Sequence, residues 1–411
     1  MTDDKKSMLT GFSSTAIHGG HEQDPHYAHI TPIYASSTYV FDNAEQGMRR
    51  FSGAEPGYIY SRWGNPTMTE AEAKTCAMET HGWVAENGEA LPLKAILHAS
   101  GMAAISTLMM STLKSGDKIL SHYSLYGGTQ ELTDRVLPGL GIESLILDLR
   151  DLNKAEEALK SNPAIRMIYL ETPANPTIQC VDIEALTALA RQYNKIIACD
   201  NTFATPYLQQ PFRYGVDYVV HSTTKFLNGH GTAIGGVLLG RDVEFMETRA
   251  TKVHRLLGGN ANPFDAYLLI TGMKTLELRI TRQNESALTI ARYLQKHPRV
   301  KEVFYPGLES HSGHTIAKGQ MRGFGGIMSF SLDTGYDGVK KFLPKLNLVH
   351  LAASLGSVST LAGPPRTTSH VELTEEQRKQ LGIPEALVRY SVGIENVEDL
   401  LEDLEQALAS L

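Results

Sequence analysis

Between residues 117 and 240 the sequence alternates short apolar runs with longer amphipathic stretches. The runs are rich in β-branched residues and predict strands, whereas the longer stretches carry apolar residues at helical spacing. Strands that alternate with helices favour parallel pairing in a sheet buried on both faces. We therefore expect an α/β fold with a mainly parallel central sheet. The expected strands are DKILSHY, ESLILDL, RMIYLET, KIIACD and DYVVHS, and the expected helices are DLNKAEEALKSN and DIEALTALARQY.

The segments before this region predict an arm and the start of the large domain. Residues 1–63 are rich in His, Pro, Gly and Tyr and show no helical period, so we expect an arm that lies on another surface. A helix is predicted after Pro66, because proline suits the first helical position. A polar insert at 81–92 has no role that we can assign. The stretch KAILHASGMAAISTLMMSTL then predicts a strand, a tight turn and a helix.

The pattern changes again near residue 277. A long helix, LELRITRQNESALTIARYLQKH, precedes the strand-like runs KEVFYPG, GGIMSFSL, HLAASLGS and ALVRYSVGIE, and an acidic amphipathic helix ends the chain. This mixture predicts a smaller α+β domain. We expect an N-terminal arm at 1–63, a large domain at 64–276 and a smaller C-terminal domain at 277–411.

The composition limits the class of protein. A hydrophobic fraction of 42% and a charged fraction of 20% are typical of soluble globular proteins, and 411 residues suffice for two domains. The net charge of −7, without a basic block, argues against nucleic-acid binding. Three scattered cysteines show no metal-site spacing and predict a reducing, cytoplasmic compartment. No run approaches the roughly 18 apolar residues of a membrane span.

The segment 218–236, YVVHSTTKFLNGHGTAIGG, places one lysine between a predicted strand and a glycine-rich turn. Lys225 follows Ser222 and Thr224, whose hydroxyls can bind an anion, and the glycines let the backbone approach a flat ligand. This chemistry fits pyridoxal 5'-phosphate, which a lysine holds as an imine and nearby hydroxyl and N–H groups hold by its phosphate. The alternative is a solvated lysine in a polar loop, because short motifs also occur by chance.

Other candidates fall at or just after expected strand ends, where ligands bind in parallel sheets. Asp200 ends an apolar strand, where a charge is costly unless it is paired, and a protonated pyridine nitrogen is a suitable partner. The alternative for Asp200 is a helix cap. Gly101 and Met102 lie at a predicted helix start, whose N–H groups attract phosphate. Tyr126 and Asn175 also follow predicted strands.

Two arginines are candidates for binding anions. Arg62, in the motif YSRWGNPT, can clamp a phosphate in bidentate fashion, and the alternative is an ion pair with a surface carboxylate. Arg389 lies in the apolar run LVRYSV, where an unpaired guanidinium is unfavourable. A substrate carboxylate would be a bidentate partner for Arg389, and the alternative is a buried structural ion pair.

Eight motifs, spread over nearly the whole chain, are together very specific for one family. The chain resembles the trans-sulfuration enzymes of cysteine and methionine metabolism. These are pyridoxal-phosphate-dependent enzymes of fold type I, the aspartate-aminotransferase-like fold. The motifs are YSRWGNPT, SGMAAI, LYGGT, ETPANPT, DNTFATPYLQQP, VVHSTTKFLNGHG, ASLG and VRYSVGIE.

The resemblance implies a role for each residue that matches a family motif. Lys225 would be the Schiff-base lysine that also moves protons between substrate carbons. Asp200 would be the partner of the pyridine nitrogen. Tyr126 would stack on the cofactor ring and serve in acid–base chemistry. The resemblance assigns the phosphate-binding cup to Gly101, Met102, Ser222 and Thr224.

The remaining matches concern the neighbouring subunit and the substrate. Tyr60 and Arg62 match a pair that reaches the phosphate of a neighbouring subunit's cofactor, so the arm would complete a shared site. Asn175, Ser354 and Arg389 match the groups that hold the cofactor edge and the substrate carboxylate. Family members are usually homotetramers, built as dimers of dimers, that act on small amino acids. From the cysteine spacing, the net charge and the lengths of the apolar runs we expect no metal, no nucleic-acid partner and no membrane association.

Departures from the family pattern bear on the substrate. Methionine γ-lyases typically carry a cysteine at the position of Gly128 and a Lys-Asp pair at the positions of His254 and Arg255. Enzymes that handle cystathionine often carry an acid where this chain has Ala353, which instead leaves an apolar pocket suited to a thioether or an ester. The segment QMRGFGG is more similar to that of the γ-synthases.

We expect γ-elimination from a methionine-like amino acid, which gives a 2-oxo acid, ammonia and a thiol. One alternative is γ-replacement on an O-acyl- or O-phosphohomoserine, as in an O-acylhomoserine sulfhydrylase or a cystathionine γ-synthase. An alternative of another class is a non-catalytic protein that binds pyridoxal phosphate. The leaving group and the acceptor thiol stay open.

Overall fold

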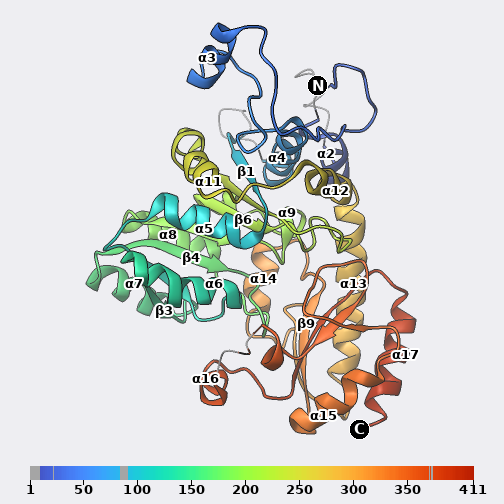
Figure 1. Ribbon diagram of the computed structural model, residues 1–411. Helices are drawn as coiled ribbons and strands as arrows, with labels where there is room; N and C mark the ends of the chain where they lie inside the picture. Colours follow the sequence, from blue (N-terminus) through green and yellow to red (C-terminus); the bar gives the residue numbers. More distant parts are fainter. Residues whose placement is uncertain (1–9, 22, 84–90, 370, 372–373) are drawn as a thin grey trace. The chain divides into compact units, whose positions relative to one another are not determined.

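The computed structural model describes residues 10–21, 23–83, 91–369, 371 and 374–411 (Figure 1). Residues 84–90 of the insert, and the first nine residues of the expected arm, lie outside the described residues. The chain forms two compact units. The first comprises Met1–Thr112, Val220–Thr224 and Thr232–Thr275, and the second comprises Leu113–Val219, Lys225–Gly231 and Leu276–Leu411.

The first unit is built on helix α4 and an antiparallel strand pair. Helix α4 (Pro66–Glu79) begins at Asn65, whose side chain caps it, and strand β1 (Lys94–His98) leads by a tight turn into α5 (Gly101–Thr112). These three elements confirm the sequence expectation. Strand β7 (Gly236–Gly240), which we did not expect, pairs antiparallel with β1. The remaining helices of this unit include α11 (Thr251–Leu257) and α12 (Pro263–Met273).

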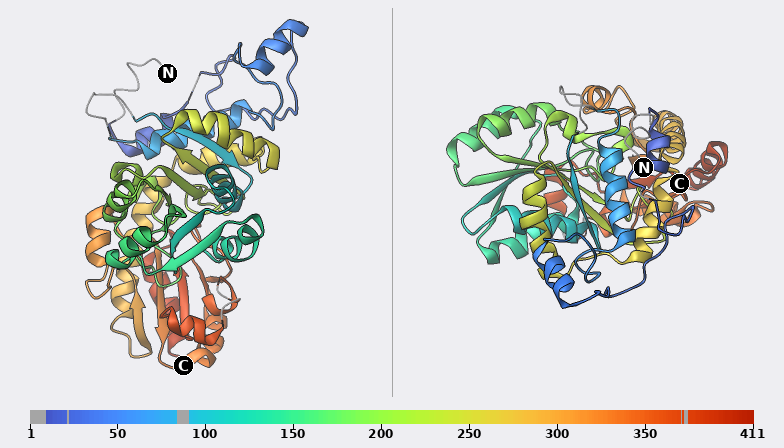
Figure 2. Two further views of the ribbon diagram at one scale, coloured as in Figure 1. Left: turned by 90° about the vertical axis from the view of Figure 1, so that its left-hand side faces the viewer. Right: turned by 90° about the horizontal axis from the view of Figure 1, so that it is seen from above.

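Within the expected arm the structure contains two short helices that the sequence reasoning missed. They are α2 (Phe12–His18) and α3 (Ala44–Ser52), and α3 is capped by the side chain of Asn43 and ends at Gly53 in the left-handed region. Helix α4 packs against α2, β1 and α12 (Figures 1 and 2). Helices of seven and nine residues are too short to form in isolation, so their stability depends on caps and packing.

A buried lysine ties α4 to the end of α2. The Lys74 ammonium is fully buried and donates hydrogen bonds to the carbonyl oxygens of Ala16 (3.1 Å), Ile17 (2.9 Å) and Gly19 (2.9 Å). Burial lowers the pKa of Lys74 to about 8. These carbonyls belong to the last turn of a helix, where a positive charge is favourable.

The second unit contains the parallel strands that the alternating pattern predicts. They are β2 (Lys118–His122), β3 (Glu143–Leu147), β4 (Ile165–Glu171) and β5 (Ile196–Asp200), and the pairs β2–β3, β2–β4 and β4–β5 are all parallel. Helices α7 (Leu152–Ser161) and α8 (Ile183–Gln192) lie where we expect them. These elements are confirmed.

Strand β6 (Tyr218–Ser222) begins in the second unit and ends in the first. The seven-stranded sheet has the strand order β1-β7-β6-β5-β4-β2-β3. It is mixed, because β1 and β7 are antiparallel, and β2 to β5 supply the parallel part. The expected α/β class is thereby confirmed.

The C-terminal part of the second unit has its own five-stranded sheet, with the order β10-β11-β12-β9-β8. The strands are β8 (Val300–Phe304), β9 (Ile327–Leu332), β10 (His350–Leu351), β11 (Leu361–Gly363) and β12 (Leu387–Ser391). Helices α13 (Leu276–Leu294), α15 (Gly335–Phe342) and α17 (Val397–Leu408) pack on it or on one another (Figure 2). The core between them includes Tyr305, Phe330, Phe342 and Tyr390.

No helix in the described part of the chain combines the length and the apolar character that crossing a membrane requires. Among the same residues, no group of three or more His, Cys, Asp or Glu side chains is placed to hold a metal ion.

Candidate active site

Two carboxylates end neighbouring parallel strands in the second unit. Glu171 and Asp200 are register partners at the ends of β4 and β5, and both side chains are buried. Burial, and secondly the charge of Asp200, raise the pKa of Glu171 well above its usual range. Glu171 accepts a hydrogen bond from the backbone N–H of Tyr126 (2.6 Å). The sequence reasoning missed Glu171, although its place at the end of a strand beside KIIACD could have indicated it.

Asp200 does not cap a helix. Its Oδ1 atom accepts hydrogen bonds from the backbone N–H (3.0 Å) and the hydroxyl (2.5 Å) of Thr202. The next helix, α9 (Thr205–Leu208), begins after Ala204, which makes no side-chain cap. The helix-cap alternative is therefore wrong. A buried carboxylate oriented in this way, beside a second carboxyl group, fits a cationic ligand such as a protonated pyridine nitrogen.

Lys225 lies three residues after Ser222, the last residue of β6, and is partly buried. Its Nζ atom donates a hydrogen bond to the hydroxyl of Ser354 (3.1 Å). Burial, and secondly the positive charge of Arg389, lower the pKa of Lys225 to about 8. A desolvated amine with a neutral partner is not a solvated loop lysine, and it fits a nucleophile that forms an imine.

Arg389 extends from β12 and contacts two of the other candidates. Its guanidinium donates to the side-chain oxygen of Asn175 (3.4 Å) and to the backbone carbonyl of Ser354 (3.0 Å). Arg389 is 7% exposed, and burial lowers its pKa to about 10, so it stays a cation at neutral pH. Because these acceptors are neutral oxygens rather than carboxylates, the positive charge of the Arg389 guanidinium can pair with an incoming anion.

The loop after β4 and the loop after β2 supply the other polar groups of this unit. Asn175 donates through its side-chain nitrogen to the hydroxyl of Ser369 (3.0 Å). Tyr126 precedes the short helix α6 (Gly127–Glu131), and its side chain is 47% exposed. Tyr126 lies close enough to Arg389 to raise the pKa of that guanidinium, although burial lowers it more.

The candidates for binding phosphate lie in the first unit. Helix α5 begins at Gly101, and Met102 follows in the same turn, so this turn presents N–H groups without partners inside the helix. A Cβ atom on Gly101 would lie 2.9 Å from the Cβ atom of Ser222, so glycine is needed for this close approach. The Thr224 hydroxyl accepts from the N–H of Gly235 (3.0 Å). The start of a helix offers N–H groups to an anion, and the absence of a side chain at Gly101 lets Ser222 lie beside that start. Together these groups fit a phosphate.

Tyr60 and Arg62 also belong to the first unit. The Arg62 guanidinium lies over the Tyr60 ring, 5.6 Å from its centroid, and donates to the backbone carbonyl of Arg255 (2.8 Å). Arg255 in turn donates to the carbonyl of Trp63 (3.0 Å). The partner that the structure gives Arg62 is thus a backbone carbonyl, and the surface ion pair that we considered is not what it forms. The neighbouring His254 packs edge-on against His98, with ring centroids 4.5 Å apart.

The described residues thus fall into two groups. In the second unit, hydrogen bonds connect Lys225 and Asn175 to Arg389 and Ser354, whereas Glu171 connects Tyr126 to Asp200. The first unit holds the other six candidates, which are Tyr60, Arg62, Gly101, Met102, Ser222 and Thr224. Thr224 and Lys225 are consecutive in the chain, so the peptide between them joins the two groups.

Comparisons with known proteins agree with these observations. The family described as "Cys/Met metabolism PLP-dependent enzyme" matches residues 13–409. An L-methionine gamma-lyase of Fusobacterium nucleatum subsp. nucleatum is 44% identical, covering 98% of this chain and 99% of the relative. An O-succinylhomoserine sulfhydrylase of Pseudomonas aeruginosa is 37% identical, covering 97% of this chain and 96% of the relative.

A solved structure supports the fold. The structure titled metB from Corynebacterium glutamicum is 38% identical, has a TM-score of 0.89, and covers 98% of this chain and 99% of its own. The expected aspartate-aminotransferase-like fold of type I is thereby confirmed, and so is the cofactor, pyridoxal 5'-phosphate. The chain therefore belongs to the Cys/Met metabolism PLP-dependent enzymes, and it is a pyridoxal-phosphate-dependent lyase or synthase of the trans-sulfuration family.

Proposed function

We propose that this enzyme eliminates the γ-substituent of a methionine-like amino acid and releases a 2-oxo acid, ammonia and a thiol. The similarity to the L-methionine gamma-lyase of F. nucleatum supports the substrate class. One geometric observation supports the chemistry. The Lys225 amine, whose pKa is about 8, donates to Ser354, and the carbonyl of Ser354 accepts from the buried cation Arg389.

Lys225 is the base in this proposal. With a pKa of about 8 instead of 10.5, roughly a tenth of the amine is neutral at pH 7, far more than in an ordinary lysine. The neutral amine takes the proton from the α-carbon of the substrate, and the resulting ammonium delivers that proton to another carbon of the substrate. When bound, pyridoxal phosphate supplies the sink for the electron pair that the α-carbon releases.

The other residues of the second unit orient the reacting groups. Arg389 binds the substrate carboxylate in bidentate fashion, and Asn175 and Ser354 fix the guanidinium and the cofactor edge. Asp200 stabilises the positive charge on the pyridine nitrogen. Tyr126, which is exposed enough to meet a ligand, stacks on the ring and takes part in proton transfer.

The residues of the first unit bind phosphate. Gly101, Met102, Ser222 and Thr224 form the cup for the cofactor's phosphate, and Tyr60 and Arg62 serve the cofactor of a neighbouring subunit. We accordingly propose a cytoplasmic homotetramer made of two dimers. The division into an arm (1–63), a cofactor-binding domain (64–276) and a C-terminal domain (277–411) is part of the same proposal.

A cavity bordered by Ala353, one residue before Ser354, is consistent with an uncharged substrate tail. Ala352 and Ala353 line this cavity of about 430 Å³ together with Leu343 and Leu351, and Lys340 and Thr367 also border it. A thioether or an ester fits such a lining, whereas the distal ammonium of cystathionine would lose hydration there. The alternative function is γ-replacement on an O-acyl- or O-phosphohomoserine, which the similarity to the O-succinylhomoserine sulfhydrylase favours.

A substrate panel separates the two functions. Purified enzyme is incubated with L-methionine, L-cystathionine, O-acetyl-, O-succinyl- and O-phosphohomoserine, each with and without sulfide, and assayed for 2-oxobutyrate, ammonia and thioether or thiol products. We expect 2-oxobutyrate and ammonia from methionine without sulfide. If methionine gives no 2-oxobutyrate, and an O-acylhomoserine with sulfide gives homocysteine, the alternative function would be established.

A further inference from the structure

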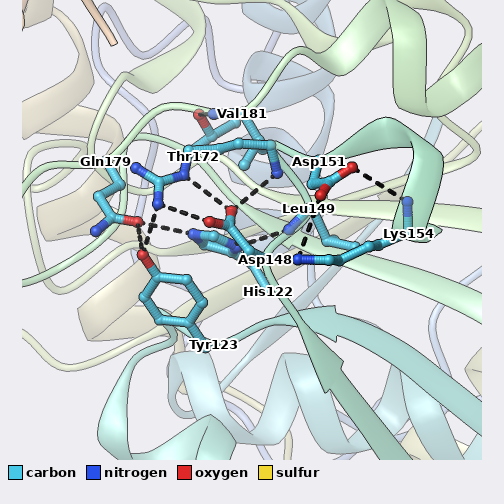
Figure 3. A network of polar contacts seen from close by, with 10 residues as sticks. His122, Tyr123, Asp148, Leu149, Asp151, Lys154, Thr172, Gln179 and Val181 are labelled. Atoms are coloured by element: carbon cyan, nitrogen blue, oxygen red, sulfur yellow. Dashed lines mark hydrogen bonds and ion pairs between the residues drawn. The ribbon is translucent and has the colours of Figure 1, made fainter. Parts of the chain in front are cut away.

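A polar network, shown in Figure 3, surrounds the buried ring of His122 and includes Gln179, four residues after Asn175 in the chain. The side-chain oxygen of Gln179 lies 2.9 Å from His122 Nε2 and accepts a hydrogen bond from the hydroxyl of Tyr123 at 2.8 Å. His122 ends β2 and Tyr123 follows it, whereas Gln179 lies after β4. One amide oxygen thus joins the loops that follow two neighbouring strands.

The direction of each hydrogen bond in the network can be assigned. The N–H of Leu149 donates to His122 Nδ1 (3.1 Å), so Nδ1 carries no proton and the neutral ring must be protonated on Nε2. His122 Nε2–H is therefore a donor to Gln179. Burial keeps this form neutral, since it lowers the pKa of His122. Both lone pairs of the Gln179 oxygen are then in use.

Arg150 orients the hydroxyl of Tyr123, which is the second donor to the Gln179 oxygen. Its guanidinium donates to the Tyr123 oxygen (2.9 Å) and forms an ion pair with Asp148 (2.7 Å). Because the Tyr123 oxygen accepts from a cation, its own proton is directed to Gln179 (Figure 3). Two branches of donors, one through His122 and one through Tyr123, therefore end on the Gln179 oxygen, and such networks rigidify the backbone that they join.

The network is tied to Asn175 from both sides. The N–H of Ala174 donates to the backbone carbonyl of Gln179 (2.8 Å), which closes the turn that contains Asn175. The hydroxyl of Ser124, next to Tyr123, donates to the backbone carbonyl of Asn175 (2.8 Å). The side-chain oxygen of Asn175 in turn accepts from Arg389 (3.4 Å).

We propose that Gln179 is a positioning residue for substrate binding, because its single oxygen holds the loop that places Asn175 against Arg389. This inference rests on the proposed role of Arg389 and Asn175 in binding the substrate carboxylate. Gln179 itself touches neither of these two side chains through its amide, so it acts only through the turn 174–179.

The test compares two substitutions at this position. Gln179→Leu keeps the size but leaves two donors without an acceptor, and we expect KM for the amino-acid substrate to rise about tenfold at nearly unchanged kcat. Gln179→Glu keeps an acceptor oxygen and should stay within about threefold of the wild-type KM. Gln192→Leu, on the exposed surface of α8, is the matched control and should leave KM unchanged.

Hydrogen exchange gives a readout that does not depend on turnover. In the holoenzyme, peptides covering 172–181 should exchange faster in Gln179→Leu than in the wild type, in Gln179→Glu or in Gln192→Leu. Tyr123→Phe removes one donor and should shift exchange and KM in the same direction by less, which keeps the test valid if Gln179→Leu does not fold. A wild type that turns over no substrate contradicts the proposed function only, because exchange still decides the role of Gln179.

Unchanged exchange in 172–181 for both Gln179→Leu and Tyr123→Phe would overturn the inference. A KM of Gln179→Leu within twofold of the wild-type KM would also overturn it. Equal damage from Gln179→Glu and Gln179→Leu would also overturn it, because the acceptor oxygen would then not be the cause.

Discussion

Glu171 and Asp200 are register partners at the carboxyl ends of two adjacent parallel strands, and both are buried. Two carboxylates in this arrangement cannot both ionise at low cost. The raised pKa of Glu171 favours its protonated form, so the negative charge of the pair resides on Asp200. In the proposed site, this asymmetry provides one anion for the cofactor nitrogen and one neutral group that accepts the N–H of Tyr126.

Substituting the two acids should therefore have unequal effects. Asp200→Asn removes the charge and should lower kcat/KM by about 100-fold or more, since one charge pair at ~4 Å is worth several kcal/mol. Glu171→Gln keeps an acceptor for Tyr126 and should stay within about tenfold of wild type. The measurement is kcat/KM of both variants, together with their absorbance spectra. Equal losses of kcat/KM would contradict the assignment of the negative charge to Asp200.

The lowered pKa of Lys225 predicts a pH-dependent stability. Below about pH 8 both the folded and the unfolded states carry the proton, so the folded state bears the full cost of the buried ammonium. This cost declines as the pH rises from about 8 to 10.5 and is absent above that range. Lys225→Met should hence raise Tm of the cofactor-free chain at pH 7 by a few degrees, and the gain should vanish near pH 10.5.

Calorimetry across this pH range provides the measurement, with the exposed Lys154→Met as the control that should show no such trend. A gain that grows with pH would have the wrong sign for a buried ammonium. The same Lys225→Met variant should lose turnover entirely while still binding pyridoxal phosphate non-covalently.

Arg62→Ala should weaken cofactor binding by about 10- to 100-fold, because a charge-assisted hydrogen bond to phosphate contributes about 1.5–3 kcal/mol. If the residue serves a neighbouring subunit, mixing Arg62→Ala with Lys225→Ala should restore activity, since some mixed sites combine one intact lysine with one intact arginine. Arg49→Ala, which removes an exposed ion pair with Glu55, is the control. Absence of any restored activity after verified subunit exchange would refute the shared site.

Gly101→Ala should reduce cofactor affinity by about tenfold with a small effect on folding. The added Cβ would lie 2.9 Å from the Ser222 Cβ atom and would push the serine away from the start of α5. Gly139→Ala, where a Cβ atom meets nothing within 4 Å, is the matched control. Equilibrium dialysis of the cofactor measures the affinity of both variants. Equal affinities would contradict the proposed role of Gly101 in binding the cofactor's phosphate.

Ala353→Glu should change substrate preference towards cystathionine. A carboxylate at position 353, one residue before Ser354, can pair with the distal ammonium of cystathionine, and we expect the ratio of kcat/KM for cystathionine over methionine to rise about tenfold. Ala353→Gln is nearly the same size without the charge and should leave the ratio close to that of wild type. If both variants shift the ratio equally, size rather than charge sets the preference.

The elements that the sequence predicted well are those with strong local signals. Strands β2 to β5 are apolar runs between polar turns, and α13 has a long amphipathic repeat, so their types follow from the residues alone. Strand β7 was missed because its five residues, GVLLG, carry no period of their own, and only pairing with β1 makes them a strand. The run HLAASLGS, read as a strand, forms only the two residues of β10.

The same distinction applies to the site. Lys225, Asp200 and Arg389 could be singled out because a charged residue beside an apolar strand needs an explanation. Glu171 ends an apolar strand in the same way and could have been singled out, although its pairing with Asp200, 29 residues away, needs the fold. Gln179 gives no such signal, since its importance lies in a partner 57 residues away, as the hydrogen bond to His122 shows. Only a folded arrangement reveals which of many ordinary polar residues meet.

The contacts of Lys74 limit how far the N-terminus can be trimmed. Its three acceptors are the carbonyls of Ala16, Ile17 and Gly19. Removing the chain up to residue 10 leaves those carbonyls in place, whereas removing residues 1–20 would leave a buried ammonium with none of them. A truncated form of the protein should therefore begin before Phe12, the first residue of the helix that supplies these carbonyls.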